Sequence, residues 1–146
     1  MNTTLASRAD LVRQASDCVA ARTRATRYHE LAAQRRFELA IDAEVRTSIA
    51  AIYQERCAEA ITEAVTANQR LVLIDIPTYY GDAEPAYREY WWKAGVRCKA
   101  IVRHLSAYLR HEGFTVLEGE QYYTRTYRGA KRGNIGLHAI PLTILW

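Results

Sequence analysis

The chain has 146 residues and a net charge of +4, and this length supports one domain with a sizeable core. Hydrophobic residues make up 49% and charged residues 25%, as in ordinary soluble globular proteins. No apolar run approaches the roughly 20 residues that a membrane helix requires, so we expect no membrane partner. The polar N-terminus also lacks the apolar core of a secretion signal.

The first half of the chain is predicted to be helical. Residues from about 4 to 68 contain no Gly or Pro and are rich in Ala, Arg, Glu and Leu. The pattern leaves open whether this half is one helix or two. Beta-branched and basic residues interrupt the apolar pattern at Thr23–His29. We therefore favour a break there, with helices at roughly 4–25 and 30–68.

Two patterns concern the start of this segment. Ser7 and Asp10 have the spacing of a capping box. Three apolar residues recur at steps of seven and are the candidate interface residues of a first helix: Leu5, Val12 and Val19. The next two steps are Thr26 and Ala33, which weaken a coiled-coil seam.

A strand, a long helix and a second strand form the centre of the predicted fold. Leu71–Ile76 is an apolar run apart from Asp75, which favours a central strand covered on both faces. The helix is expected near 83–112, ending at Gly113 as a left-handed C-terminal residue. The strand Phe114–Glu118 follows at once, so the two strands should be joined by a parallel crossover.

Trp92 and Val96 fall off the apolar stripe of this long helix. An outward Trp beside a Val suggests a docking surface, because aromatic residues concentrate in interfaces. The alternative is that the N-terminal segment covers both residues.

The C-terminal region is predicted to be a strand at 121–128, a glycine-containing loop and a final strand at 137–146. Pro141 implies that the final strand lies at an edge or contains a bulge. Aromatic and basic residues alternate on this hairpin and its loop: Tyr122, Tyr123, Arg125, Tyr127, Arg128, Lys131 and Arg132. Such residues can stack bases and hold phosphates. The alternative is a strand with one buried face and a solvated Arg face.

Chemistry-bearing residues form no convincing catalytic set. Asp75, with Asp82 and Glu84 beyond it, could supply carboxylates for a metal or for acid–base work, or Asp75 could simply fix a turn. The four histidines show no ligand spacing. Three widely spaced cysteines fit buried small side chains in a reducing compartment: Cys18, Cys57 and Cys98. We predict no catalytic residues, no metal and no cofactor.

Three segments together resemble a recurring class of small proteins encoded by tailed phages and large DNA viruses. They are a helix ending at Ala60–Ala64 before the first strand, the helix-terminating Leu109–Val116, and the terminal Leu142–Trp146. The resemblance implies a virion-associated or accessory protein that contacts other virion subunits, located in the virion after assembly in the host cytoplasm.

The expected fold class is α+β. A long N-terminal helical segment packs on a small mixed sheet of three to four strands with one long crossover helix, divided into an arm at 1–29 and a body at 30–146. The leading functional hypothesis is a non-enzymatic structural subunit of a phage or viral particle that forms homo-oligomers. The second is a nucleic-acid-binding protein that uses the basic hairpin, and the third is a metal-dependent nuclease around Asp75.

Overall fold

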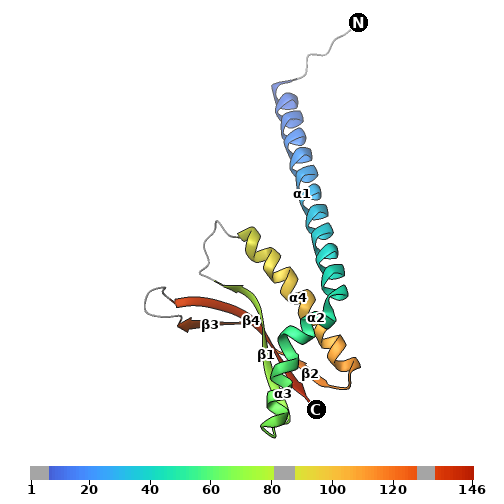
Figure 1. Ribbon diagram of the computed structural model, residues 1–146. Helices are drawn as coiled ribbons and strands as arrows, with labels where there is room; N and C mark the ends of the chain where they lie inside the picture. The colour runs from blue at the N-terminus through green and yellow to red at the C-terminus, as the bar shows by residue number, and fades with distance from the viewer. Residues whose placement is uncertain (1–6, 81–87, 128–133) are drawn as a thin grey trace. The chain divides into compact units, whose positions relative to one another are not determined.

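The computed structural model has the α+β fold that the sequence predicts, with four α-helices, one π-helical turn and a four-stranded sheet in the described residues (Figure 1). The described residues are 7–80, 88–127 and 134–146. Within them, some residues are described by their backbone alone: 79–80, 88–91, 123–127 and 134–137. The chain falls into two compact units, which divide between Phe37 and Glu38 and are described separately.

Helix α1 spans Arg8–Thr47 without interruption, so the predicted break at Thr23–His29 is wrong. The threonines in this stretch are accommodated because their hydroxyl groups bond within the helix. Thr23 Oγ1 donates to the Val19 carbonyl at 3.0 Å, and Thr26 Oγ1 donates to the Arg22 carbonyl at the same distance. With no Gly or Pro present, nothing else in this stretch breaks the helix.

The predicted capping box at the start of α1 is confirmed. The Ser7 N–H donates to Asp10 Oδ2, and the Asp10 N–H donates to Ser7 Oγ, both at 3.2 Å. This exchange satisfies backbone donors that the first turn of a helix leaves unpaired.

The predicted second helix at 30–68 is instead divided at Ser48. The Ser48 N–H is shared between the carbonyls of Glu44 and Val45, each at 3.1 Å. Three short helical elements follow: α2 (Ile49–Tyr53), the π-helical turn η1 (Gln54–Ala58) and α3 (Glu59–Thr66). Helix α3 ends at Thr66, and Asn68, which follows the C-cap residue Ala67, adopts a left-handed conformation with φ of 57°.

The sheet contains β1 (Leu71–Tyr80), β2 (Thr115–Glu118), β3 (Tyr122–Tyr127) and β4 (Asn134–Leu145). Strand β4 pairs with each of the other three, and all three pairings are antiparallel. The prediction of a mixed sheet is therefore wrong, because no two hydrogen-bonded strands among the described residues are parallel. Strands β1 and β2 nevertheless run in the same direction with β4 between them, so they are the near neighbours that the crossover predicted.

Strand β1 pairs only with β4 among the described residues, which places it at an edge rather than at the predicted centre. The apolar run led to a wrong prediction because only one face of β1 is buried. Ile74 and Ile76 are buried, whereas Leu71 and Leu73 on the other face are exposed. A strand buried on one side needs no second neighbour to account for its apolar content.

Pro141 lies in the central strand β4, so the predicted edge position is wrong, and the register irregularity of the sheet lies between Pro77 and Tyr79 of β1 rather than at Pro141. The proline is tolerated because β2 and β3 pair with different parts of β4, and Pro141 falls between the two pairings. Its carbonyl accepts the Gly119 N–H at 2.8 Å in this gap. A β-carbon at Gly119 would lie 2.5 Å from Pro141 Cγ, so only glycine fits this turn.

Helix α4 (Arg88–His111) packs on β1, β2 and β4 with α2 beside it (Figure 1). The start predicted at residue 83 lies outside the described residues, but the predicted end is confirmed. Gly113 has φ of 98°, its N–H donates to the Arg110 carbonyl at 3.1 Å, and the Phe114 N–H donates to the Leu109 carbonyl at 3.0 Å. These two bonds form the Schellman motif that closes a helix.

The core lies between these helices and one face of the sheet. Its fully buried large side chains come from all layers: Val45, Ile76, Leu105, Leu109, Leu142 and Ile144. Cys57 and Cys98 are buried beside them as predicted, and burial raises the pKa of each thiol to about 11. Cys18 is exposed on α1, so the prediction of burial fails for it. No helix in the described ranges is long and apolar enough to cross a membrane.

Candidate interaction surfaces

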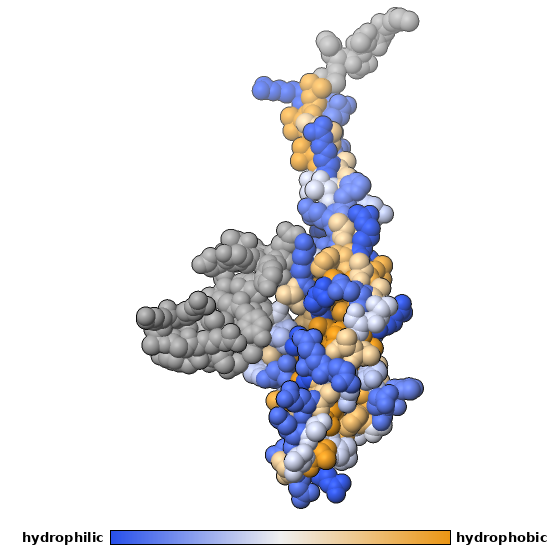
Figure 2. Space-filling model, viewed as in Figure 1, coloured by the Kyte–Doolittle hydropathy of each residue, from blue (hydrophilic) through white to orange (hydrophobic). Residues whose placement is uncertain are grey.

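The first apolar surface lies near the start of α1, where Figure 2 shows hydrophobic residues gathered among hydrophilic ones. We call it the arm stripe and define it by five exposed residues: Leu11, Val12, Ala15, Cys18 and Val19. At 3.6 residues per turn these positions fall within an arc of roughly 120°, which makes one helix face. Val12 is 65% exposed and Val19 is 62% exposed.

The arm stripe contains two of the three predicted arm residues. Leu5, the third, lies outside the described residues. C-terminal to Val19 the same face continues with Arg22, Thr23 and Thr26, so the stripe ends after about two turns. A seam of seven-residue steps therefore does not extend along the helix.

The second apolar surface is the face of the sheet opposite the core. Cross-strand pairing places Leu71, Leu145 and Thr115 in one row, and Leu73, Thr143 and Leu117 in the next. We call the four leucines in these rows the leucine patch: Leu71, Leu73, Leu117 and Leu145. Leu73 is 58% exposed and Leu117 is 57% exposed. The patch thus presents large apolar side chains from three neighbouring strands to solvent.

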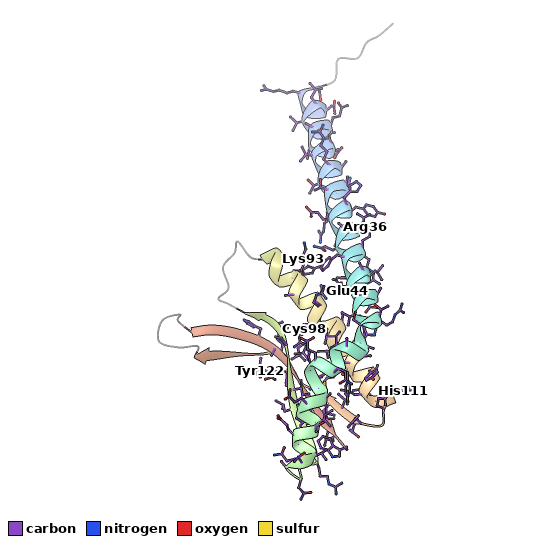
Figure 3. The ribbon with its side chains drawn as sticks, viewed as in Figure 1. Arg36, Glu44, Lys93, Cys98, His111 and Tyr122 are labelled. Atoms are coloured by element: carbon purple, nitrogen blue, oxygen red, sulfur yellow. The ribbon has the colours of Figure 1, made fainter. Side chains whose placement is uncertain are left out.

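Tyr122 lies at the other end of this sheet face and connects two of its strands. Its hydroxyl donates to Asp75 Oδ2 at 2.5 Å, so a side chain from β3 reaches across β4 to β1 (Figure 3). Ala139 lies beneath this bridge, opposite Tyr122 in the register, and is fully buried. The hydrogen bond to Asp75 raises the pKa of Tyr122, with burial contributing in the same direction. Asp75 therefore joins strands rather than fixing a turn.

Trp92 and Val96 on α4, the other predicted interface residues, are both partly buried. Neither is the fully exposed anchor that an outward docking surface at this position would present.

The residues of the predicted nucleic-acid site fall largely outside the description. Tyr123, Arg125 and Tyr127 lie on β3, where the backbone confirms the predicted strand and pairs with β4. Their side chains are outside the described set, and so are the residues Arg128, Lys131 and Arg132.

The most charged cluster joins the end of α1 to α4. The guanidinium of Arg97 bonds both oxygens of Glu44, at 2.8 and 3.2 Å, and this pairing lowers the pKa of Glu44. Asp42 Oδ1 bonds Arg103 and also lies 2.9 Å from His104 Nε2.

The carboxylate of Asp42 favours a protonated His104, but burial and the guanidinium groups of Arg103 and Arg46 outweigh it and lower the pKa of His104. A neutral His104 whose Nε2 donates to Asp42 accounts for the contact. The cluster has the geometry of a structural clamp between two helices.

Nothing in the described part of the chain forms a group of three or more His, Cys, Asp or Glu side chains that could hold a metal ion. Comparisons of the chain with protein-family models, with curated proteins and with solved structures found no match.

Proposed function

We propose that the protein is a non-enzymatic structural subunit that assembles through protein–protein contacts, with the arm stripe as its assembly contact. The observation that supports this proposal is the exposure of the five stripe residues on a helix of 40 residues. A helix in a protein owes most of its stability to the packing of its apolar face against other elements. An apolar stripe that is exposed in a single chain is therefore suited to burial against another chain.

The arm also has a composition that suits fixed contacts. Residues 8–37 contain seven Arg and three acidic residues and no Lys. Arg forms planar, multidentate contacts and is enriched in interfaces, whereas Lys is depleted there. Placement of this subunit in a phage or viral particle, beside other virion subunits, is a proposal carried by the sequence resemblance alone.

The proposal is tested by removing the apolar character of the stripe. Val12→Asp/Val19→Asp places two charges on the stripe, whereas Gln14→Asp/Ala21→Asp places two charges at the same spacing outside the stripe, about 160° around the helix from Val12 and Val19. We expect the native protein and the Gln14/Ala21 variant to share one oligomeric mass on a sizing column with light scattering. We expect the Val12/Val19 variant to have the mass of a monomer. An unchanged mass for the Val12/Val19 variant would refute the assembly role of the arm.

Nucleic-acid binding by the basic hairpin is the competing proposal, and the same column tests it. A monomer that elutes with absorbance at 260 nm, and loses it as salt is raised, would favour this alternative, because phosphate contacts are strongly salt dependent.

A further inference from the structure

We infer that the middle of helix α1 binds double-stranded DNA, with its arginines contacting phosphates on both sides of the major groove. We call this part of the helix, residues 20–36, the basic segment. It contains five Arg, one Glu and no Lys or Asp, so its net charge is +4. The basic segment begins after the arm stripe, and this inference does not depend on the assembly proposal.

The positive charge of α1 is concentrated in the basic segment. Residues 8–19 contain two Arg and two Asp and have no net charge. Residues 38–47 contain three acidic residues and one Arg, so their net charge is −2. Arg clustered along one part of a helix is typical of nucleic-acid-binding elements, because each phosphate that a protein cation neutralises releases a bound counterion. The basic segment therefore has the charge pattern of a helix that binds a polyanion.

Four arginines of the basic segment have no acidic partner in the described part of the chain. They are exposed, and none of their guanidinium groups makes an ion pair or a hydrogen bond there: Arg22, Arg24, Arg27 and Arg36. Arginines of α4 differ, since Arg97 and Arg103 each bond a carboxylate. Arg24 and Arg27 also lie three residues apart, a spacing at which side chains are neighbours on the helix surface and like charges repel. An anionic partner would remove this repulsion.

The four arginines lie on two opposite sides of the helix. At 3.6 residues per turn, Arg22 and Arg36 are about 40° apart around the axis, and Arg24 and Arg27 are about 60° apart. The two pairs are separated from each other by about 120–180°. A flat anionic surface, of a protein or of a membrane, contacts only one side of a helix. Positive charges on opposite sides instead fit a groove with phosphates along both walls.

The major groove of B-form DNA is a groove of this kind. It is about 12 Å wide, which admits an α-helix of about 10–12 Å diameter, and a phosphate backbone runs along each side. The major groove of A-form RNA is too deep and narrow for side chains to read. Duplex DNA is therefore the polyanion whose shape and charge match the basic segment.

The distribution of the other side chains indicates which face of the helix enters the groove. Between the two pairs of arginines, one face carries Ala21, Ala25 and Tyr28, all exposed. This face has no acidic residue within the basic segment. The opposite face carries Glu30, whose carboxylate would repel phosphates. Small side chains allow a close approach to the base edges, so the face with Ala21 and Ala25 points into the groove.

Fluorescence anisotropy of a labelled DNA duplex of about 20 base pairs, titrated with the full-length protein, tests the inference. Four phosphate contacts predict that log K falls against log salt concentration with a slope of about −3.6 for each copy bound. Affinity should therefore fall about a thousandfold between roughly 20 and 150 mM salt. Non-specific DNA binding near physiological salt has a Kd of roughly 10⁻⁴–10⁻⁶ M, so a sizing column at that salt separates the protein from DNA.

Matched double variants separate the basic segment from the other basic residues of the chain. Arg22→Gln/Arg27→Gln removes one arginine from each side of the helix and should reduce the slope by about 1.8. Arg8→Gln/Arg13→Gln makes the same charge change outside the segment and should leave the slope unchanged. Arg125→Gln/Arg128→Gln, in the hairpin, should also leave it unchanged. Gln keeps the helix propensity of Arg, and far-UV circular dichroism confirms that each variant is folded.

Three outcomes would overturn the inference. The first is a native protein that does not bind the duplex at about 20 mM salt. The second is a slope that the hairpin variant reduces and the Arg22/Arg27 variant does not, which would favour the competing proposal for the hairpin. The third is equal affinity for a duplex RNA of the same length, which would exclude the major-groove contact. DNA affinity at least tenfold above RNA affinity, with the slope reduced only by the Arg22/Arg27 variant, would support the inference.

Discussion

Tyr122→Phe removes one hydroxyl group and should destabilise the protein measurably. The hydroxyl donates to the carboxylate of Asp75 at 2.5 Å, and the second carboxylate oxygen is buried without a hydrogen-bond partner. A hydrogen bond to a charged group contributes about 1.5–3 kcal/mol to stability. Tyr122 is 37% exposed, so solvent recovers part of this, and we expect a loss of about 1–2 kcal/mol.

The assay is urea unfolding followed by far-UV circular dichroism, with all variants at one protein concentration because assembly would otherwise shift the midpoint. Tyr28→Phe is the matched control, since Tyr28 is 70% exposed and should change stability by less than about 0.5 kcal/mol. The effect of Tyr122→Phe should shrink in an Asp75→Asn background. Equal losses in both backgrounds would refute the bridge between β3 and β1.

The same contact predicts a pH dependence. The pKa of Tyr122 is raised in the folded protein, so the folded chain holds this proton more tightly than the unfolded chain. The contribution of this contact to the free energy of unfolding should therefore be fully present below about pH 10. It should be lost as pH rises through the folded-state pKa of Tyr122. A native protein and a Tyr122→Phe variant with the same alkaline profile would contradict this.

Three further predictions concern single residues. Gly119→Ala should lower the free energy of unfolding by about 1–3 kcal/mol, because the new β-carbon would collide with Pro141. Gly95→Ala should raise it by up to about 1 kcal/mol, because Gly95 lies inside a helix with open space around it. The midpoints of urea unfolding test both changes. Cys18 alone should react with a chromogenic disulfide reagent in the folded protein, and full reaction of all three thiols would contradict the burial of the other two. The pKa of His104 is lowered by burial and nearby Arg, so stability should decrease as pH falls below about 6.5, and His104→Gln should lack that part of the decrease in acid titrations of unfolding.

Local signals in the sequence predicted the ends of helices well. Ser7 and Asp10 form the predicted capping box, and Gly113 ends α4 as predicted. Both motifs could be predicted because each depends on a few neighbouring residues. The apolar spacing of α4 likewise predicts its buried face, since a helix fixes which side chains share a side.

Long-range pairing was beyond the sequence pattern. Strand β1 was predicted to be central, and Pro141 was predicted to lie at an edge or a bulge, because each inference used one strand without its neighbours. The actual arrangement depends on β2 and β3 sharing one side of β4, which only the register reveals. The leucine patch was missed for the same reason, since its members come from three strands separated in the chain.

The most direct test of the assembly role is the molar mass of the native chain by light scattering on a sizing column, over a range of loading concentrations. The account predicts a mass above 16.7 kDa that rises with concentration and carries no excess absorbance at 260 nm. A constant mass of 16.7 kDa at every concentration would contradict it.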